Sequence, residues 1–120
     1  MKKILLIALV ALSSVTFAQD YVATSNTFFY MFAGEDTTKQ IESSCTITVT
    51  DERIIKLFWD ESDHIDVFTS MGTMTKDSMF QFMNKDAVVY DIQYRPELNG
   101  WTFRKADRSY LFHIVIAKEF

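Results

Sequence analysis

The chain has 120 residues, of which 48% are hydrophobic and 15% aromatic, and its formal net charge is −4. This size and composition are typical of one globular domain with a core of its own. The acidic charge argues against nucleic acid as a partner, because phosphate backbones bind basic surfaces. Cys45 is the single cysteine, which excludes an internal disulfide bond.

The first eighteen residues follow the pattern of a secretory signal peptide. Lys2 and Lys3 precede an apolar run, residues 4–12, that is too short to span a bilayer as a helix. The small residue Ala18 then marks the expected cleavage site. We therefore predict a secreted or periplasmic protein with no integral membrane span after processing. It would keep ten basic residues against sixteen acidic ones.

Residues 19–26 are mostly polar or small, and we expect them to form a loose lead-in to a single domain over residues 27–120. Residues 27–32, TFFYMF, predict the first strand. This strand is apolar on both faces, which indicates burial on both sides or contact with a partner. A polar turn at residues 34–38 ends it.

The clearest pattern in the chain is a hairpin between Cys45 and Trp59. Apolar residues alternate with threonines in its first strand, so one face is apolar and the other is polar. A three-residue loop, residues 51–53, places Val49 opposite Ile55 and sends Cys45 and Trp59 to the same inward face. A two-residue loop would reverse every side chain. Cys45 is therefore expected to be a buried hydrophobe and not a reactive thiol.

Further strands are predicted at residues 65–70, 87–94, 101–104 and 110–117. In the first of these, Ile65 and Val67 are expected to face inward if Trp59 does, and Gly72 marks a turn after it. Residues 74–83 fit a strand better than the alternative, a single capped helical turn.

About eight short strands joined by short links require antiparallel neighbours. The sequence thus predicts an all-β fold, an up-and-down meander that closes as a small calycin-like barrel or folds into a sandwich. In a barrel the first and last strands, both apolar on two faces, become neighbours. Their outward residues would form one interaction patch, made of Phe29, Met31, Leu111 and Val115.

The chain contains eleven Phe, five Tyr and two Trp. Aromatic rings in this number build the core of a small β-domain, or they line a pocket for an apolar ligand. Inward positions of the predicted strands supply the candidate lining of such a pocket. These residues are Trp59, Phe80, Tyr90, Ile92, Trp101 and Phe103.

Motifs for metal binding or catalysis are few. Residues 60–66, DESDHID, are the one dense group of metal-capable side chains, and Asp63, His64 and Asp66 are the candidate ligands. The segment lacks the glycine and final glutamate of a calcium loop, so a solvated acidic loop is the preferred interpretation. His113 lies among apolar strand residues, where packing or hydrogen bonding is expected. With no nucleophile motif or phosphate loop, the sequence predicts no catalytic residue and no cofactor.

Two resemblances concern the last strand and the whole chain. The alternation of Phe112, Ile114 and Ile116 before Phe120 resembles the last strand of outer-membrane β-barrel proteins. Most of the predicted strands are shorter than the about 9–11 residues that membrane strands need. The chain as a whole resembles small secreted β-meander proteins of Bacteroidota with no assigned function. The shared features are the short signal peptide, Gln19 at the mature start and the final strand YLFHIVIAKEF. That resemblance carries over no functional residues.

We therefore predict a non-catalytic binding protein that takes a hydrophobic small molecule or a protein partner. The alternative is a structural or interaction module that self-associates, for example as a homodimer, through its first and last strands. An enzyme of unknown class and a small outer-membrane barrel are further alternatives. A ligand inside the barrel requires space among the inward aromatic residues, whereas self-association requires an exposed outer patch.

Overall fold

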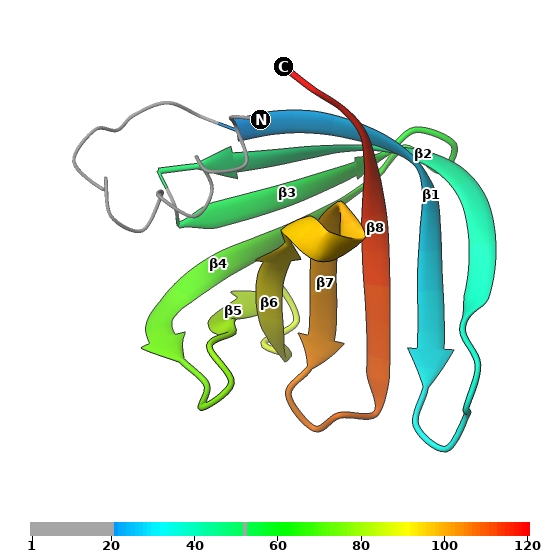
Figure 1. Cartoon of the computed structure of the whole chain (residues 1–120). Coiled ribbons are helices and arrows are strands. Elements are labelled where there is room, and N and C mark those ends of the chain that lie inside the picture. Colours follow the sequence, from blue (N-terminus) through cyan, green and yellow to red (C-terminus); the bar gives the residue numbers. More distant parts are fainter. Residues whose placement is uncertain (1–20, 52) are drawn as a thin grey trace.

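The computed structural model describes residues 21–51 and 53–120. Its eight antiparallel strands follow one another around a closed barrel, which β8 completes by pairing with β1 (Figure 1). The prediction of an all-β up-and-down meander is confirmed, and of its two forms the chain adopts the barrel. The predicted signal peptide lies outside the described residues. The elements are β1 (Tyr21–Phe32), β2 (Lys39–Thr50), β3 (Ile54–Trp59), β4 (His64–Met74), β5 (Phe80–Asn84), β6 (Val89–Arg95), the short 3-10 helix η1 (Pro96–Leu98), β7 (Gly100–Lys105) and β8 (Tyr110–Glu119).

The hairpin of β2 and β3 has the predicted register. Val49 lies opposite Ile55 and Cys45 opposite Trp59, with residues 51–53 left as the loop. Asp51 adopts the left-handed backbone conformation, with φ of 52°, that tight hairpin loops commonly need and that no glycine supplies here. The odd loop length therefore keeps the apolar sides of both strands on the same inward face.

The first strand, β1, begins earlier than predicted. Residues 21–26, expected as a loose lead-in, form its first half, and Ala23 and Ser25 are buried inside the barrel. A β-bulge between Ser25 and Thr27 then shifts the alternation, so Phe28 faces inward and Phe29 outward. The Ser25 hydroxyl donates a hydrogen bond to the Thr27 carbonyl oxygen at 3.0 Å across this bulge. Small side chains thus mark a crowded part of the interior and not a loop.

The prediction for the inward face of β4 is wrong. The link from β3 has four residues, 60–63, so His64 and Asp66 join the inward face of β3. Ile65 and Val67 face outward, and Ile65 is 45% exposed. Only an odd number of link residues would have brought Ile65 and Val67 inside, because successive strand side chains alternate.

The turn predicted at Gly72 also lies elsewhere. Gly72 sits within β4, with φ of 78°, where the pairing of β4 with β5 shifts register between Ser70 and Met74. The chain turns instead at residues 75–79. The expected strand over residues 74–83 is confirmed only in its second part, as β5.

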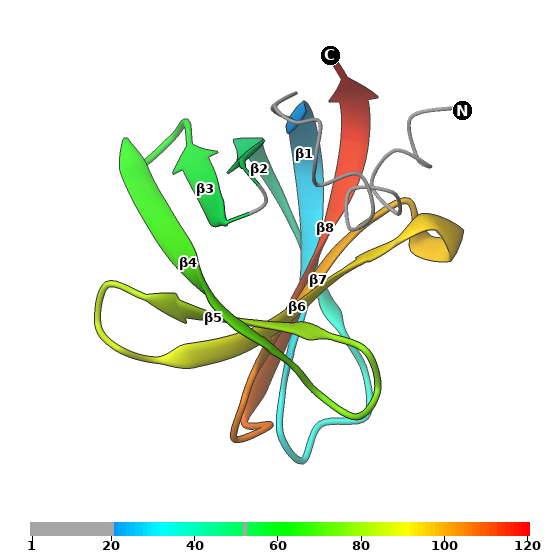
Figure 2. The same ribbon diagram turned by 90° about the vertical axis from the view of Figure 1, so that its left-hand side faces the viewer.

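Side chains fill the interior of the barrel. Phe103 is the largest fully buried one, and it stacks on Phe112 with ring centroids 4.6 Å apart. The sheet twists strongly, so that β5 and β6 cross the direction of β1 and β8 (Figure 2). The buried core consists of Ala23, Cys45, Ile47, Ile55, Leu57, Phe68, Phe82, Ile92, Trp101, Phe103, Phe112, Ile114 and Ile116.

The meander gives the barrel two distinct ends. At the acidic end lie the four links of residues 33–38, 60–63, 85–88 and 106–109. At the terminal end lie the links of residues 51–53, 75–79 and 96–99, the start of β1 and the end of β8. The four links of the acidic end carry seven acidic residues, Glu35, Asp36, Asp60, Glu61, Asp63, Asp86 and Asp107, against the basic Lys85 and Arg108.

Candidate binding sites at the acidic end and on the outer face

Aromatic side chains gather on the inward face at the acidic end of the barrel. They come from β1, β3, β6 and β8, whose inward positions near this end hold rings. Each ring is half-buried against the core, so each keeps part of its surface in solvent. We call the following five residues the aromatic end cluster: Phe28, Tyr30, Trp59, Tyr90 and Tyr110.

The rings of the aromatic end cluster pack on the buried ring of Phe112. The ring centroid of Phe112 lies 5.7 Å from that of Tyr110, 6.4 Å from that of Tyr90 and 6.5 Å from that of Phe28. Trp59 contacts Phe28 edge-on at 5.2 Å. Buried rings therefore form a floor beneath partly exposed ones, an arrangement that suits an apolar molecule with a flat or rounded surface.

The tyrosine hydroxyl groups of this cluster point to solvent. Those of Tyr30, Tyr90 and Tyr110 have no hydrogen-bond partner within residues 21–51 and 53–120. None of their oxygen atoms is buried without a partner, so each reaches solvent. Burial raises the pKa of Tyr90 and Tyr110, and the charge of Asp66 adds to the effect at both. The hydroxyls of Tyr90 and Tyr110 therefore stay protonated at neutral pH and can donate as well as accept.

Asp66 is the carboxylate that faces inward from β4 beside the cluster. Its Oδ2 accepts a hydrogen bond from Trp59 Nε1 at 2.9 Å, which fixes the indole ring. His64 Nε2 lies 2.8 Å from its Oδ1, and the Asp66 side chain is 36% exposed. A carboxylate accepts about four hydrogen bonds, so these two contacts leave Asp66 able to meet a further group.

Of the three candidate metal ligands, the structure brings His64 and Asp66 together. Asp63 lies in the turn before them, with a left-handed φ of 58°. Across the described ranges, no group of three or more His, Cys, Asp or Glu side chains could hold a metal ion. The His64–Asp66 pair instead places a hydrogen-bonded carboxylate next to Trp59.

The six residues expected to line a pocket separate into three groups. Trp59 and Tyr90 belong to the aromatic end cluster. Ile92 and Phe103 are fully buried core residues. Trp101 and Phe80 lie toward the terminal end, where Phe80 is 46% exposed. None of the six lines the two clefts described below, both of which lie on the outside of the barrel.

Cys45 and His113 have the structural roles expected from the sequence. Burial, with Asp60 and Asp66 nearby, raises the pKa of the Cys45 thiol to about 12, so the thiol stays protonated and unreactive. His113 points outward from β8, where Thr102 Oγ1 lies 2.9 Å from its Nδ1 and the Leu98 carbonyl oxygen 3.2 Å from its Nε2. Burial lowers the pKa of His113, which favours a neutral ring that donates from Nε2 to Leu98.

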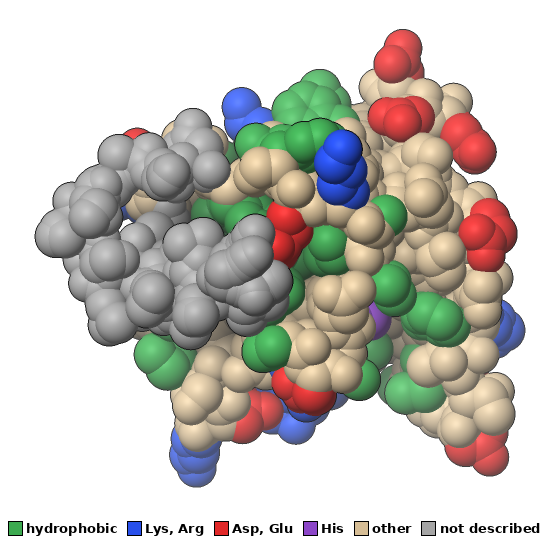
Figure 3. All heavy atoms as spheres, turned by 45° about the horizontal axis from the view of Figure 1, so that its top comes forward, with side chains coloured by type: hydrophobic (Ala, Val, Ile, Leu, Met, Phe, Trp, Pro, Cys, Tyr) green, Lys and Arg blue, Asp and Glu red, His purple; other side chains and the backbone are tan. Residues whose placement is uncertain are grey.

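The predicted interaction patch lies on the outer face of β1 and β8. Met31 is directly opposite Leu111 in the β1–β8 ladder, and Phe29 and Val115 lie on the same side. All four side chains are half-buried. Figure 3 shows hydrophobic side chains at several places on the face turned to the viewer, with other side chains and backbone between them.

Two clefts on the outer face meet beside this patch. The larger, of about 520 Å³, runs along β6, β7 and η1, and the smaller, of about 130 Å³, borders the end of β1. Leu111 and Arg104 line both, and Met31 lines the smaller one. Two of the four patch residues, Met31 and Leu111, therefore line a cleft on the outer face.

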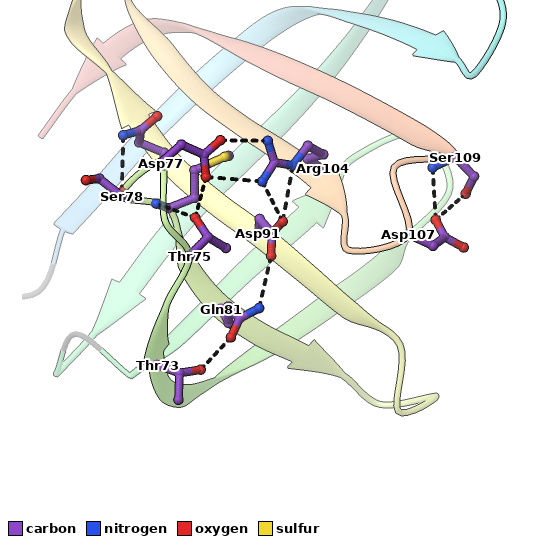
Figure 4. Close-up of polar contacts among 11 residues, drawn as sticks. Thr73, Thr75, Asp77, Ser78, Gln81, Asp91, Arg104, Asp107 and Ser109 are labelled. Carbon is purple, nitrogen blue, oxygen red and sulfur yellow. Dashed lines mark hydrogen bonds and ion pairs between the residues drawn. The ribbon is translucent and has the colours of Figure 1, made fainter.

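Arg104 holds the link of residues 75–79 against the outside of the barrel (Figure 4). It contacts Asp91 Oδ2 at 2.7 Å and Asp77 Oδ2 at 3.0 Å, and this pairing with Arg104 lowers the pKa of Asp77. Met79, the last residue of this link, is buried although it does not belong to the core cluster inside the barrel. No sequence pattern indicated this network, because its members lie far apart along the chain and meet only when β6 and β7 pair.

The fold and these surfaces define a small closed β-barrel with a half-exposed aromatic cluster at one end and clefts on its outer face. No family model, curated protein or solved structure matches the chain. Among the described residues, no helix has the length and apolar character needed to cross a bilayer.

Proposed function

We propose that this protein is a secreted or periplasmic, non-catalytic binding protein, and that it binds a small, largely apolar molecule on the aromatic end cluster. The observation that carries the proposal is the combination, at one end of a packed barrel, of half-buried rings and hydroxyl groups that have no hydrogen-bond partner within the described residues. Rings supply affinity for an apolar molecule, and the hydroxyls orient it.

The packed interior supports a ligand at the end of the barrel and not deep inside it. Phe103 and Phe112 stack across the interior, and their surroundings are buried. A ligand would therefore rest on Phe112 between Tyr90 and Tyr110. The expectation of a ligand inside the barrel is therefore given up, because core side chains occupy that space, and the small-molecule proposal now concerns the half-exposed rings at the acidic end.

Nuclear magnetic resonance titration of the mature chain tests this proposal. A panel of small neutral arenes and aliphatic alcohols should shift amide resonances of the aromatic end cluster and leave those around Trp101 unchanged. Tyr110→Ala should weaken the binding, whereas Tyr94→Ala, at the terminal end, is the matched control and should not. Shifts confined to the outer clefts, or no saturable shifts with any compound, would contradict the proposal.

The outer face favours a second candidate, a protein partner or self-association. Leu111 lines both clefts and lies opposite Met31 in the predicted interaction patch. If this surface mediates self-association, light scattering should show a dimer or larger species. Phe29→Glu should then yield a monomer, because Phe29 faces outward and a charge there disrupts an apolar contact. A wild-type chain that is monomeric at high concentration would remove the self-association form.

A further inference from the structure

We infer that the aromatic end cluster selects an organic cation, a quaternary ammonium or a protonated amine, with Asp66 as its counter-ion. This inference rests on the proposed function and adds the charge of the ligand to it. It combines three features of the acidic end: the position of Asp66, the aromatic faces around it, and the charge of the surrounding links.

Asp66 occupies an inward position whose cross-strand neighbour is the fully buried Leu57. Such a position normally holds an apolar side chain, as at Phe68 two residues later on the same strand. The carboxylate is oriented by Trp59 Nε1, and its charge acts on both Tyr90 and Tyr110. A fixed negative charge is thus placed beside the same rings that would contact the ligand.

Aromatic faces attract cations because the ring quadrupole is negative above and below the plane, and cages of Tyr and Trp recognise quaternary ammonium groups. The chain already contains one such contact at this end. Lys39 Nζ lies 5.9 Å from the ring centroid of Tyr30, while its charge pairs with Glu35 at 2.9 Å. A neutral apolar ligand would not need the carboxylate, whereas a cation gains from both the rings and Asp66.

The surrounding links strengthen the preference for positive charge. Their seven acidic residues outnumber the two basic ones. Two further basic residues, Lys39 and Lys105, lie where strands meet these links, and Lys39 forms an ion pair with Glu35. Lys105 lies close enough to Asp107 for its charge to contribute to lowering the pKa of that carboxyl group. The potential at the acidic end is therefore negative, which draws cations toward the cluster.

A pair of isosteric probes tests the inference. Choline and 3,3-dimethylbutan-1-ol have the same shape and differ in the charge of the quaternary centre. In amide-resonance titrations of the mature chain, choline should bind about tenfold more tightly than the neutral alcohol. Its shifts should centre on Trp59, Tyr90 and Tyr110. Equal affinities, or tighter binding of the alcohol, would overturn the inference and leave the proposed function intact.

Asp66→Asn removes the charge and keeps an oxygen that can accept from Trp59 Nε1. This variant should lose about tenfold in choline affinity and clearly less in affinity for the neutral alcohol, so the ratio of the two affinities should fall toward one. Asp36→Asn is the matched control, because it removes the same charge from an exposed position of the same end and should leave choline binding within about twofold. Tyr110→Leu keeps apolar area and removes the aromatic ring, so it should also weaken choline binding. This second variant tests the inference even if Asp66→Asn folds poorly.

The outcomes separate the two proposals. If both probes and every neutral arene leave the cluster unperturbed, the proposed function and the inference fail together. If neutral compounds bind there and choline does not, only the inference fails. An equal loss of choline affinity in Asp66→Asn and Asp36→Asn would show general charge attraction and would also refute a specific counter-ion.

Discussion

The two ends of the barrel hold the same kinds of residue in different environments. At the terminal end, Trp101 is buried with ring centroids 5.6 Å from Tyr21 and 5.3 Å from Tyr94. The Tyr21 hydroxyl donates to the Glu119 carboxylate at 2.9 Å. Burial raises the pKa of Tyr21 far above its usual range. At the acidic end the rings are half-buried, and their hydroxyls have no partner in the described part of the chain.

The difference shows that aromatic content alone does not define a binding site. Each end also has a carboxylate near its rings, but the two carboxylates have different partners. Glu119 accepts a tyrosine hydroxyl and so completes a contact within the fold. Asp66 accepts the indole N–H of Trp59 and leaves the tyrosines of its end unsatisfied. At the terminal end the polar atoms of Tyr21 and Trp101 are therefore bonded within the fold, and Tyr94 alone resembles the acidic-end tyrosines in having a hydroxyl without a partner among the described residues.

Truncating one ring at each end should give the largest contrast. Trp101→Ala should lower the free energy of unfolding by about 3–5 kcal/mol, because it leaves a void in the core. Tyr110→Ala should cost only about 1–2 kcal/mol, since its ring is half-buried. Urea unfolding followed by circular dichroism measures both losses. Equal losses would mean that the acidic end is as tightly packed as the terminal end.

Removing one hydroxyl at each end should have a smaller effect that isolates the hydrogen bonds. Tyr21→Phe should cost about 1 kcal/mol, because it breaks the bond to Glu119. Tyr110→Phe should change stability by less than about 0.5 kcal/mol, since its hydroxyl has no partner within the described residues. The same urea experiment compares them. A marked loss in Tyr110→Phe would reveal a hydrogen bond at the acidic end.

Thiol labelling should show the smallest effect. Cys45 pairs across the sheet with Trp59, beneath the aromatic end cluster, and burial raises the pKa of its thiol to about 12. The native chain should therefore react negligibly with a thiol reagent at pH 8 and fully once unfolded in urea. Rapid native labelling would mean that the acidic end opens down to the core.

Much of the fold followed from residue alternation. The register of the hairpin from Cys45 to Trp59 was predicted correctly because apolar and polar residues alternate strictly in its first strand. The early start of β1 was missed because Ala23 and Ser25 are small, and small residues resemble a loop until a neighbouring strand is seen to crowd them. The inward face of β4 was wrong because the hydrophobicity of Ile65 was given more weight than the length of the link.

The candidate sites were predictable only in part. Trp59 and Tyr90 were named from their inward positions, and the outward placement of Phe29 and Leu111 on neighbouring strands followed from a closed barrel. Tyr30 and Tyr110 lie in the two strands that are apolar on both faces, which marked these strands as unusual. The sequence did not indicate that both tyrosines lie at the same end of the barrel. Asp66 was considered as a metal ligand and not as an inward-facing carboxylate, because its direction depends on the four-residue turn before it.

The sequence by itself determined the strands and most of their inward faces, because alternation between apolar and polar residues is a local property. It also determined that the chain is acidic and rich in aromatic rings. Only the tertiary structure decided which rings meet at which end, that Arg104 joins Asp77 to Asp91, and that Asp66 faces inward and bonds Trp59. These outcomes depend on loop lengths, bulges and the closure of β1 on β8, which act between residues distant in the chain.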